Sequence, residues 1–253
     1  MTQQFDLGDK IAIVTGGSRG LGYAIAHGLA QGGADVVIAS RKLDACRRAA
    51  DTIGEATGRA VLPVACHVGR WQDCDALVDA ALTRFGRIDV LVNNAGMSPL
   101  YDDLVDVSEE LYDKTLAVNL KGPFRLGVLA ATHMAKHGGG AIINVGTVGS
   151  LLASPNELPY ACAKAGLNAL TVGLAEAFAP HVRVNAILPG AFDTDVTRAW
   201  SPEMRSGDYI PMGRLGQPSE IVGAAVYLAS DAGSYTTGST IRVDGGVTRR
   251  VGG

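Results

Sequence analysis

The amino-acid sequence predicts an α/β fold in which seven parallel strands form a doubly wound sheet with helices on both faces. Two observations lead to this prediction. Short runs rich in β-branched residues alternate with segments of helical length from one end of the chain to the other. No internal repeat, low-complexity tract or linker interrupts the alternation. The connections are long enough for parallel crossovers, which we expect to be right-handed.

Each element can be placed from its residue pattern. The expected strands are the apolar runs 10–17, 34–40, 60–68, 88–96, 140–147, 182–190 and 240–246. The expected helices include 20–33, 43–56, 72–86, 108–137 and 160–178. The helix over 108–137 contains Pro123, which removes an N–H donor and clashes with the preceding turn. We therefore expect this helix to be disturbed about one turn earlier, near Asn119.

The composition of the 253-residue chain predicts one globular domain, 1–253, and argues against two classes of partner. Hydrophobic residues make up 47% of the chain, enough for a substantial core, and the formal net charge is −3. The basic residues are scattered, so we expect no nucleic-acid partner. No apolar run reaches the roughly 18 residues that span a bilayer, and no signal peptide is recognisable. We expect a cytoplasmic protein with no membrane partner.

The cysteines and one irregular segment complete this outline. Cys46, Cys66, Cys74 and Cys162 lack the paired short spacing of a metal site, and no ligand set accompanies His67 beside Cys66. We expect buried free thiols and no metal. The segment 195–216 has no strand or helix pattern and is predicted to leave the sheet as an excursion. Loops of this length often cover or bind ligands, so a substrate loop is expected at about 195–212.

A glycine-rich turn, Gly16-x-x-x-Gly20-x-Gly22, follows the first strand and opens the first helix. Glycines permit tight backbone passage, and the free N–H groups of a helix amino terminus can bind a diphosphate. If the glycines are considered by themselves, a tight turn that packs closely and binds no ligand would also explain them. Their placement between a strand and a helix favours a Rossmann-type nucleotide site.

Further motifs follow the glycine turn in a fixed order and carry a family resemblance. They are Asn93-Asn94-Ala95-Gly96, Tyr160-x-x-x-Lys164, Pro189–Gly190, "PMGRLGQPSEIVGAAVYLASD" and "TGSTIRVDGG". Together they resemble the single-domain bacterial branch of the short-chain dehydrogenase/reductase family over essentially the whole chain. The resemblance implies a nicotinamide cofactor across the carboxyl ends of the strands, a small ketone or alcohol substrate, and a homotetramer.

The resemblance also implies which residues contact the cofactor. They are Gly16, Ser18, Arg19, Gly20, Leu21, Gly22, Ser40, Arg41, His67, Val68, Asn94, Ala95, Gly96, Tyr160, Lys164, Pro189, Gly190 and Thr194. NAD-binding members usually place an acidic residue after the second strand, whereas this chain has Ser40 and Arg41 there, with Arg19 in the glycine turn. A guanidinium can hold a 2′-phosphate with two hydrogen bonds. NADP(H) is therefore favoured over NAD(H), unless Arg41 merely begins the next helix.

One position departs from the family pattern at the end of the third strand. Members commonly have an aspartate facing the adenine, and this chain has His67 there, beside Val68 as the usual apolar partner. An imidazole can hydrogen-bond to adenine or stack on it. A surface histidine with no role is the alternative.

The predicted proton chemistry centres on Tyr160 and Lys164, which share one helix face at i and i+4. A tyrosine normally loses its proton near pH 10, so a nearby ammonium is expected to lower its pKa. By the resemblance, Tyr160 exchanges a proton with the substrate oxygen, Lys164 holds the nicotinamide ribose, and the backbone of Asn119 holds a water in the proton path.

The fourth catalytic position is Thr147, thirteen residues before Tyr160, where the family usually has serine. Threonine keeps the hydroxyl that would hold the substrate oxygen, but its methyl group restricts χ1 and narrows the pocket. A misplaced donor would cost about 1–3 kcal/mol. Ser150 is the second choice for this hydroxyl.

The substrate cannot be named from the sequence, but its surroundings can be predicted. By analogy, the pocket is edged by Met97, Ser98, Leu151, Phe192 and Trp200. This mainly apolar set favours a medium-sized neutral ketone, while Arg198 and Arg205 keep an acidic substrate open. The leading interpretation is an NADP(H)-dependent oxidoreductase of a carbonyl/secondary-alcohol pair. The alternatives are a catalytically silent NADP-binding protein and an NAD-dependent sugar or alcohol dehydrogenase.

Overall fold

The computed structural model describes residues 3–195, 197 and 200–248, and it confirms the predicted parallel sheet. The strands are β1 Ile11–Thr15, β2 Asp35–Ser40, β3 Val61–Ala65, β4 Val90–Asn93, β5 Gly140–Val145, β6 Val182–Pro189 and β7 Thr240–Val243. They form one seven-stranded sheet in the order β3-β2-β1-β4-β5-β6-β7, and every neighbouring pair is parallel. Each strand lies within its predicted run.

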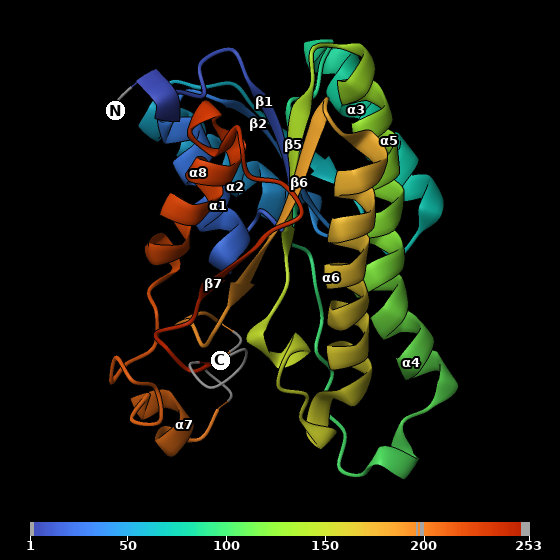
Figure 1. Ribbon diagram of the computed structural model, residues 1–253, viewed down its shortest axis with the longest axis vertical. Helices are drawn as coiled ribbons and strands as arrows, with labels where there is room; N and C mark the ends of the chain where they lie inside the picture. The colour runs from blue at the N-terminus through green and yellow to red at the C-terminus, as the bar shows by residue number, and fades with distance from the viewer. Residues whose placement is uncertain (1–2, 196, 198–199, 249–253) are drawn as a thin grey trace.

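Helices cover both faces of the sheet (Figure 1). One face carries α1 Gly20–Gln31, α2 Leu43–Thr57 and α8 Val222–Ala229, and the other carries α3 Trp71–Phe85, α5 Gly122–Lys136 and α6 Leu158–Phe178. Successive strand residues alternate between the two helical layers, because side chains on a strand point to opposite faces. Val92 belongs to the core on the first face, and its neighbour Leu91 to the core on the second.

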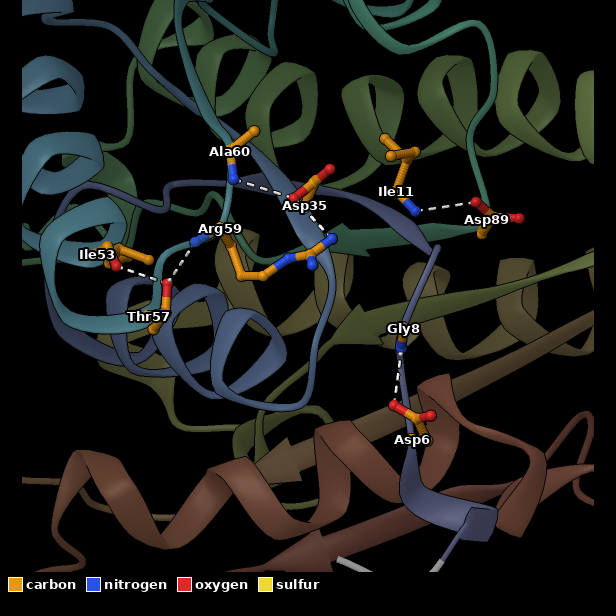
Figure 2. Close-up of polar contacts among 9 residues, drawn as sticks. All are labelled: Asp6, Gly8, Ile11, Asp35, Ile53, Thr57, Arg59, Ala60 and Asp89. Atoms are coloured by element: carbon orange, nitrogen blue, oxygen red, sulfur yellow. Dashed lines mark hydrogen bonds and ion pairs between the residues drawn. The ribbon is translucent and has the colours of Figure 1, made fainter.

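Carboxylates hold the amino ends of the strands (Figure 2). Asp89 is buried and accepts a hydrogen bond from the backbone N–H of Ile11, the first residue of β1, at 2.9 Å. Asp35, which begins β2, accepts from the N–H of Ala60 at 3.0 Å and pairs with Arg59 at 2.9 Å. These contacts fix the register at this end of the sheet, so the loops at the opposite, carboxyl end are positioned by a rigid scaffold.

The strand order reverses between β1 and β4, which are sheet neighbours although two strands lie between them in sequence. Loops leaving the carboxyl ends at such a switch point diverge and open a crevice for ligands. The arrow of β6 points toward the end of the molecule that holds α7, Pro202–Ser206 (Figure 1). The expected cofactor and substrate segments therefore leave the sheet at this end.

The helix predicted over 108–137 is interrupted where expected. It consists of α4, Glu109–Leu116, a π-helical segment, Ala117–Lys121, and α5. Pro123 has no N–H to give to the carbonyl four residues earlier, that of Asn119, so regular α-helical hydrogen bonding is lost there. The prediction of a disturbance near Asn119 is confirmed, and the disturbance is a π-bulge rather than a bend.

The excursion after β6 is closed at its base by a bridge between Phe192 and Gly216. The thiols of Cys46, Cys66 and Cys74 are free and buried as predicted, whereas Cys162 is exposed. The expectation of a buried thiol was wrong at Cys162 because this position lies on the outer side of α6. In the described part of the chain, no helix combines the length and apolarity needed to cross a membrane.

Candidate active site

The glycine-rich turn packs directly against the segment that follows β4. A Cβ atom on Gly16 would lie 2.7 Å from the side-chain nitrogen of Asn94, and one on Gly22 would lie 2.3 Å from it. Both positions therefore require glycine for close packing. Gly20 is favoured for another reason, because its φ of +57° is left-handed, a conformation that L side chains rarely adopt.

The amino terminus of α1 is suited to an anion. The helix begins at Gly20 and has no acidic residue in its first turn. Its first N–H groups have no partners within the helix, and its dipole places partial positive charge at this end. The predicted binding positions Ser18, Arg19 and Leu21 lie in this turn. Backbone and charge thus fit a diphosphate here.

Thr15 at the end of β1 fixes the position of the segment after β4. Its hydroxyl accepts from the backbone N–H groups of Asn94 at 3.0 Å and Ala95 at 3.1 Å. The amide nitrogen of Asn94 in turn donates to the carbonyl of Thr15 at 2.9 Å. These hydrogen bonds join the carboxyl ends of β1 and β4, the two strands at the switch point.

Gly96 brings two predicted catalytic residues to one place. A Cβ atom at Gly96 would lie 2.9 Å from Oδ1 of Asn119 and 3.6 Å from Nζ of Lys164. The buried amide of Asn119 donates to the carbonyls of Met97 at 2.8 Å and Thr115 at 2.9 Å, and accepts from the N–H of Met97 at 3.2 Å. The π-bulge and the strand-end segment are therefore joined through one side chain.

Lys164 is buried on α6, with only 2% of its surface exposed. Its ammonium donates to the carbonyl of Val145, the last residue of β5, at 2.7 Å, and lies 5.8 Å from the centre of the Tyr160 ring. Burial lowers the pKa of Lys164 to about 8. A base with this pKa can change protonation state near neutral pH.

Tyr160 has a raised pKa of about 12 in the chain by itself. Burial contributes most, the carboxylate of Glu157 adds to it, and a hydrogen bond with Thr147 opposes both. Burial and Glu157 set the direction of this shift, and the lowering expected from the Lys164 ammonium together with an oxidised nicotinamide stays a prediction. A phenol in this state is a proton donor at neutral pH.

Thr147 lies directly after β5, at the start of the short helical turn Val148–Ser150. Its hydroxyl accepts from the N–H of Gly149 at 3.1 Å and lies close enough to Tyr160 to lower the pKa of that phenol. Ser150 points elsewhere, since its hydroxyl donates to the carbonyl of Thr147 at 2.7 Å and accepts from Asn168 at 2.9 Å. The structure thus pairs Tyr160 with Thr147 rather than with Ser150.

The residues predicted for the adenosine end of the cofactor gather at the ends of β2 and β3. Ser40 is hydrogen-bonded to the thiol of Cys46 at 3.0 Å, and Arg41 is exposed. Arg19 is mostly exposed and forms a long ion pair with Asp195 at 3.5 Å. Such exposed pairs contribute little, so an anion can compete for this guanidinium.

His67 has a defined role in the turn after β3. The ring nitrogen Nδ1 of His67 accepts from the N–H of Gly69 at 3.2 Å. The backbone N–H of His67 donates to the carboxylate of Asp73 at 3.0 Å. An accepting Nδ1 carries no hydrogen, so Nε2 of the neutral ring is a donor. Val68 beside it is buried in the core. The imidazole thus holds the turn, and its contact with an adenine stays a prediction.

The segment after β6 lies close to the glycine-rich turn. The N–H of Gly190, after Pro189, donates to the carbonyl of Val243 at 2.9 Å, and a Cβ there would lie 2.8 Å from the Cα of Asp244. Thr194 has its methyl group 3.8 Å from the Cβ position of Gly20. Two predicted cofactor segments, far apart in sequence, therefore meet.

The predicted substrate residues are distributed unevenly. Met97 and Ser98 lie beside the catalytic cluster, joined to it through Asn119 and Glu157, and Leu151 is 40% exposed. Trp200 is half-buried. Phe192 is 5% exposed and packs in the core against Gly216, so its ring does not face solvent. Arg205 lies exposed on α7, and Arg198 lies outside the described residues.

Two residues at the rim were missed by the sequence prediction. Glu157 precedes Tyr160 by three positions, and its carboxylate accepts from the hydroxyl of Ser98 at 3.2 Å. Tyr101 accepts from the N–H of Leu158 at 2.7 Å and donates to the carbonyl of Pro155 at 2.6 Å. Helical spacing to Tyr160 would have identified Glu157 from the sequence. Among the described residues, no group of three or more His, Cys, Asp or Glu side chains could hold a metal ion.

Comparison with known proteins places this geometry in context. A family model described as enoyl-(acyl carrier protein) reductase matches residues 16–248. The chain is 38% identical over 256 residues to dehydrogenase/reductase SDR family member 4 of Pongo abelii, covering 99% of this chain and 92% of that protein. It is 40% identical over 248 residues to L-rhamnose 1-dehydrogenase (NAD(P)(+)) of Azotobacter vinelandii, covering 94% and 96%. The crystal structure of NADPH-dependent 3-quinuclidinone reductase from Rhodotorula rubra superposes with a TM-score of 0.90 at 28% identity, covering 96% and 93%.

Proposed function

The chain belongs to the short-chain dehydrogenase/reductase family of oxidoreductases, and we propose that it interconverts a carbonyl compound and a secondary alcohol with NADP(H), using Tyr160 as the acid/base. The observation that carries the proposal is the clustering of four polar side chains. Asn119 and Lys164 lie beside Gly96, and Tyr160 lies near both Lys164 and Thr147. These side chains come from three separate segments, the π-bulge, the turn after β5 and α6, and they lie at the carboxyl end of the sheet, which is where α/β sheets bind ligands.

The cofactor fits the cradle formed by the glycine turn, the segment after β4 and the segment after β6. The left-handed Gly20, the uncharged first turn of α1 and the approach of Thr194 support a diphosphate at the helix terminus. When bound there, the nicotinamide supplies or accepts the hydride. Tyr160 and Lys164 then lie on the helix that borders the nicotinamide half of the site.

The side chains of this protein handle the proton. In the reducing direction, Tyr160 is protonated at neutral pH and can donate to the substrate oxygen, while the Thr147 hydroxyl stabilises charge that develops on that oxygen. Lys164 favours the phenolate that is left behind, and its hydrogen bond to Val145 holds it in position. In the oxidising direction the same phenolate is the base.

NADP(H) is the cofactor we propose, with NAD(H) as the alternative. Arg41 is exposed directly after β2, and the ion pair of Arg19 recorded among the described residues is a long surface one, so both guanidinium groups can reach a 2′-phosphate. A carboxylate usually accepts a hydrogen bond from the 2′-hydroxyl of an unphosphorylated ribose. The described segment Ser40–Lys42 contains no carboxylate. Nε2 of His67 is proposed to donate to the adenine.

We also propose that the chain acts as one domain in a cytoplasmic homotetramer. Apolar side chains that include Tyr112 at 44% and Phe124 at 45% exposure lie on the outer surface of α4 and α5. A surface hollow of about 940 Å³ lies beside them, lined by residues of α4, the π-bulge and α5. An apolar surface of this kind suits contact with another subunit.

The proposal is tested by following NADPH consumption with a panel of ketones, and NADP⁺ reduction with the matching alcohols. Turnover is expected with the wild-type protein, and Tyr160→Phe should abolish it while leaving NADPH binding intact. Binding of NADPH without turnover of any substrate would favour the catalytically silent protein. Equal or better kcat/KM with NAD(H) would favour the NAD-dependent dehydrogenase.

A further inference from the structure

Glu157 places a carboxylate at the rim of the proposed active site. We propose that Glu157 is a specificity-determining residue that accepts a hydrogen bond from the substrate, and that the preferred substrates carry a hydroxyl or ammonium group a few bonds away from the reacting carbonyl. The inference rests on the proposed function and narrows its substrate class. It replaces the expectation of a mainly apolar pocket with that of a pocket having one acidic wall.

The position of Glu157 connects two sides of the crevice. Its Oε2 accepts from the hydroxyl of Ser98, in the segment after β4, at 3.2 Å. Its Oε1 would lie 2.9 Å from a Cβ atom on Gly149, in the segment after β5. Gly149 is also bonded to the Thr147 hydroxyl, so the carboxylate adjoins the group proposed to hold the substrate oxygen.

Helix α6 does not use the Glu157 side chain. Glu157 is the residue before the helix, yet its side chain makes no capping hydrogen bond. The start of α6 is held instead by the hydroxyl of Tyr101, which accepts from the N–H of Leu158 and donates to the carbonyl of Pro155. Removing the carboxylate should therefore leave the helix start in place.

The charge of Glu157 is not balanced by a basic side chain. None of the ion pairs among the described residues includes Glu157, and its one side-chain hydrogen bond within that part of the chain is with Ser98. Ser98 is itself exposed and can release the carboxylate to another donor. A half-buried carboxylate gains most from a charged or hydrogen-bonding partner.

The location of this carboxylate carries a catalytic disadvantage unless it binds substrate. Glu157 raises the pKa of Tyr160, which disfavours the phenolate that must form in either direction of the reaction. A hydroxyl or ammonium group of the substrate bound to Glu157 would reduce this effect at the moment of proton transfer. An anionic substrate would instead be repelled, so small polyanions are excluded from the preferred class.

The test compares three cyclic ketones of similar size: cyclohexanone, 4-hydroxycyclohexanone and 4-piperidone. Glu157→Gln should lower the ratio of kcat/KM for either donor-bearing ketone to that for cyclohexanone by about tenfold or more, as expected for loss of a hydrogen bond to a charged group. If the ratio falls for 4-piperidone alone, Glu157 binds ammonium groups. If the ratio falls equally for both donor-bearing ketones, Glu157 binds hydrogen-bond donors in general. Glu157→Asp should retain part of the ratio.

Glu176→Gln is the matched control, because Glu176 is exposed farther along the same helix. If the Glu157→Gln ratio stays within twofold of this control, the inference is overturned. Calorimetric affinities of the three ketones for the protein with NADP(H) present give the same ratio without turnover. Absence of turnover would thus refute the proposed function, whereas an unchanged affinity ratio would refute the role of Glu157.

The pH profile supplies a readout that a purely structural role would not change. The charged side chains recorded around Tyr160 in the described residues are Glu157 and Lys164. Glu157→Gln removes the charged group that adds to the effect of burial on the pKa of Tyr160, so the acidic limb of kcat/KM for cyclohexanol oxidation should move to lower pH. A limb that stays in place or moves to higher pH would contradict the assignment.

Discussion

The hydroxyl of Ser150 donates to the backbone carbonyl of Thr147 at 2.7 Å, and the same hydroxyl accepts from the side chain of Asn168. Both bonding directions of Ser150 are thereby used to hold the turn after β5. The hydroxyl of Thr147 accepts from the N–H of Gly149 and lies close enough to Tyr160 to lower the pKa of that phenol. Ser150 therefore positions the loop, and Thr147 presents the hydroxyl.

Thr147→Ala is expected to lower kcat/KM by about 10²–10³, the effect of removing one donor that stabilises a developing oxyanion. Ser150→Ala should lower it less than tenfold, because only the support of the loop is lost. Thr147→Ser keeps the hydroxyl and removes the methyl, so it should stay within severalfold of wild type. Steady-state kinetics with one ketone decide this, and a larger loss from Ser150→Ala would show that the wrong hydroxyl was assigned.

Asn119→Ala is expected to destabilise the fold as well as slow the reaction. Its amide makes three hydrogen bonds, two with Met97 and one with Thr115. Because Asn119 is buried, its removal leaves these partner groups without a hydrogen bond and without access to water. The free energy of unfolding should fall by about 2–4 kcal/mol. Urea denaturation measures this, with kcat/KM taken below the transition. Asn156→Ala on the exposed loop is the control, and an equal loss there would contradict the argument.

The sheet could be predicted from the sequence because buried parallel strands are local apolar runs. The glycine turn and the Tyr160–Lys164 pair could be recognised because their spacing is also local. Pro123 likewise revealed the disturbance at Asn119, since a missing N–H acts within one turn. Cys162 was misplaced because the sequence alone did not settle which side of α6 is covered. The packing of the Phe192 ring against Gly216 could not be predicted either, because the two residues are distant in sequence.

The direction of the pKa shift at Tyr160 could not be predicted from the sequence. A neighbouring ammonium is visible as an i+4 spacing, whereas burial depends on how β5, α6 and the loops pack around the phenol. The same is true of Glu157, whose contact with Ser98 joins segments that are distant in the chain. Electrostatic balance in the site is a property of the tertiary structure.

Arg41→Glu is expected to reverse the cofactor preference. Replacing an exposed guanidinium after β2 by a carboxylate removes a partner of the 2′-phosphate and adds an acceptor for a ribose hydroxyl. The ratio of kcat/KM for NADPH to that for NADH should fall by about 10²-fold, corresponding to about 2.7 kcal/mol. Arg47→Glu, an exposed charge reversal on α2, is the control. A ratio that falls equally in both variants would indicate only the general charge of this surface.

Lys164→Met is expected to abolish activity and yet stabilise the fold at neutral pH. Burial lowers the pKa of Lys164 from 10.5 to about 8, so keeping the ammonium charged at pH 7 costs about 3 kcal/mol. Leaving the carbonyl of Val145 without its donor offsets roughly 1–2 kcal/mol, which leaves a net gain of about 1–2 kcal/mol. Between pH 8 and 10.5 the unfolded chain binds more protons at this site than the folded chain, so the stability of the wild type rises with pH and the advantage of Met disappears. Urea denaturation at pH 7 and pH 10 measures this, with the exposed Lys136→Met as control, and parallel pH dependences of wild type and Lys164→Met would contradict it.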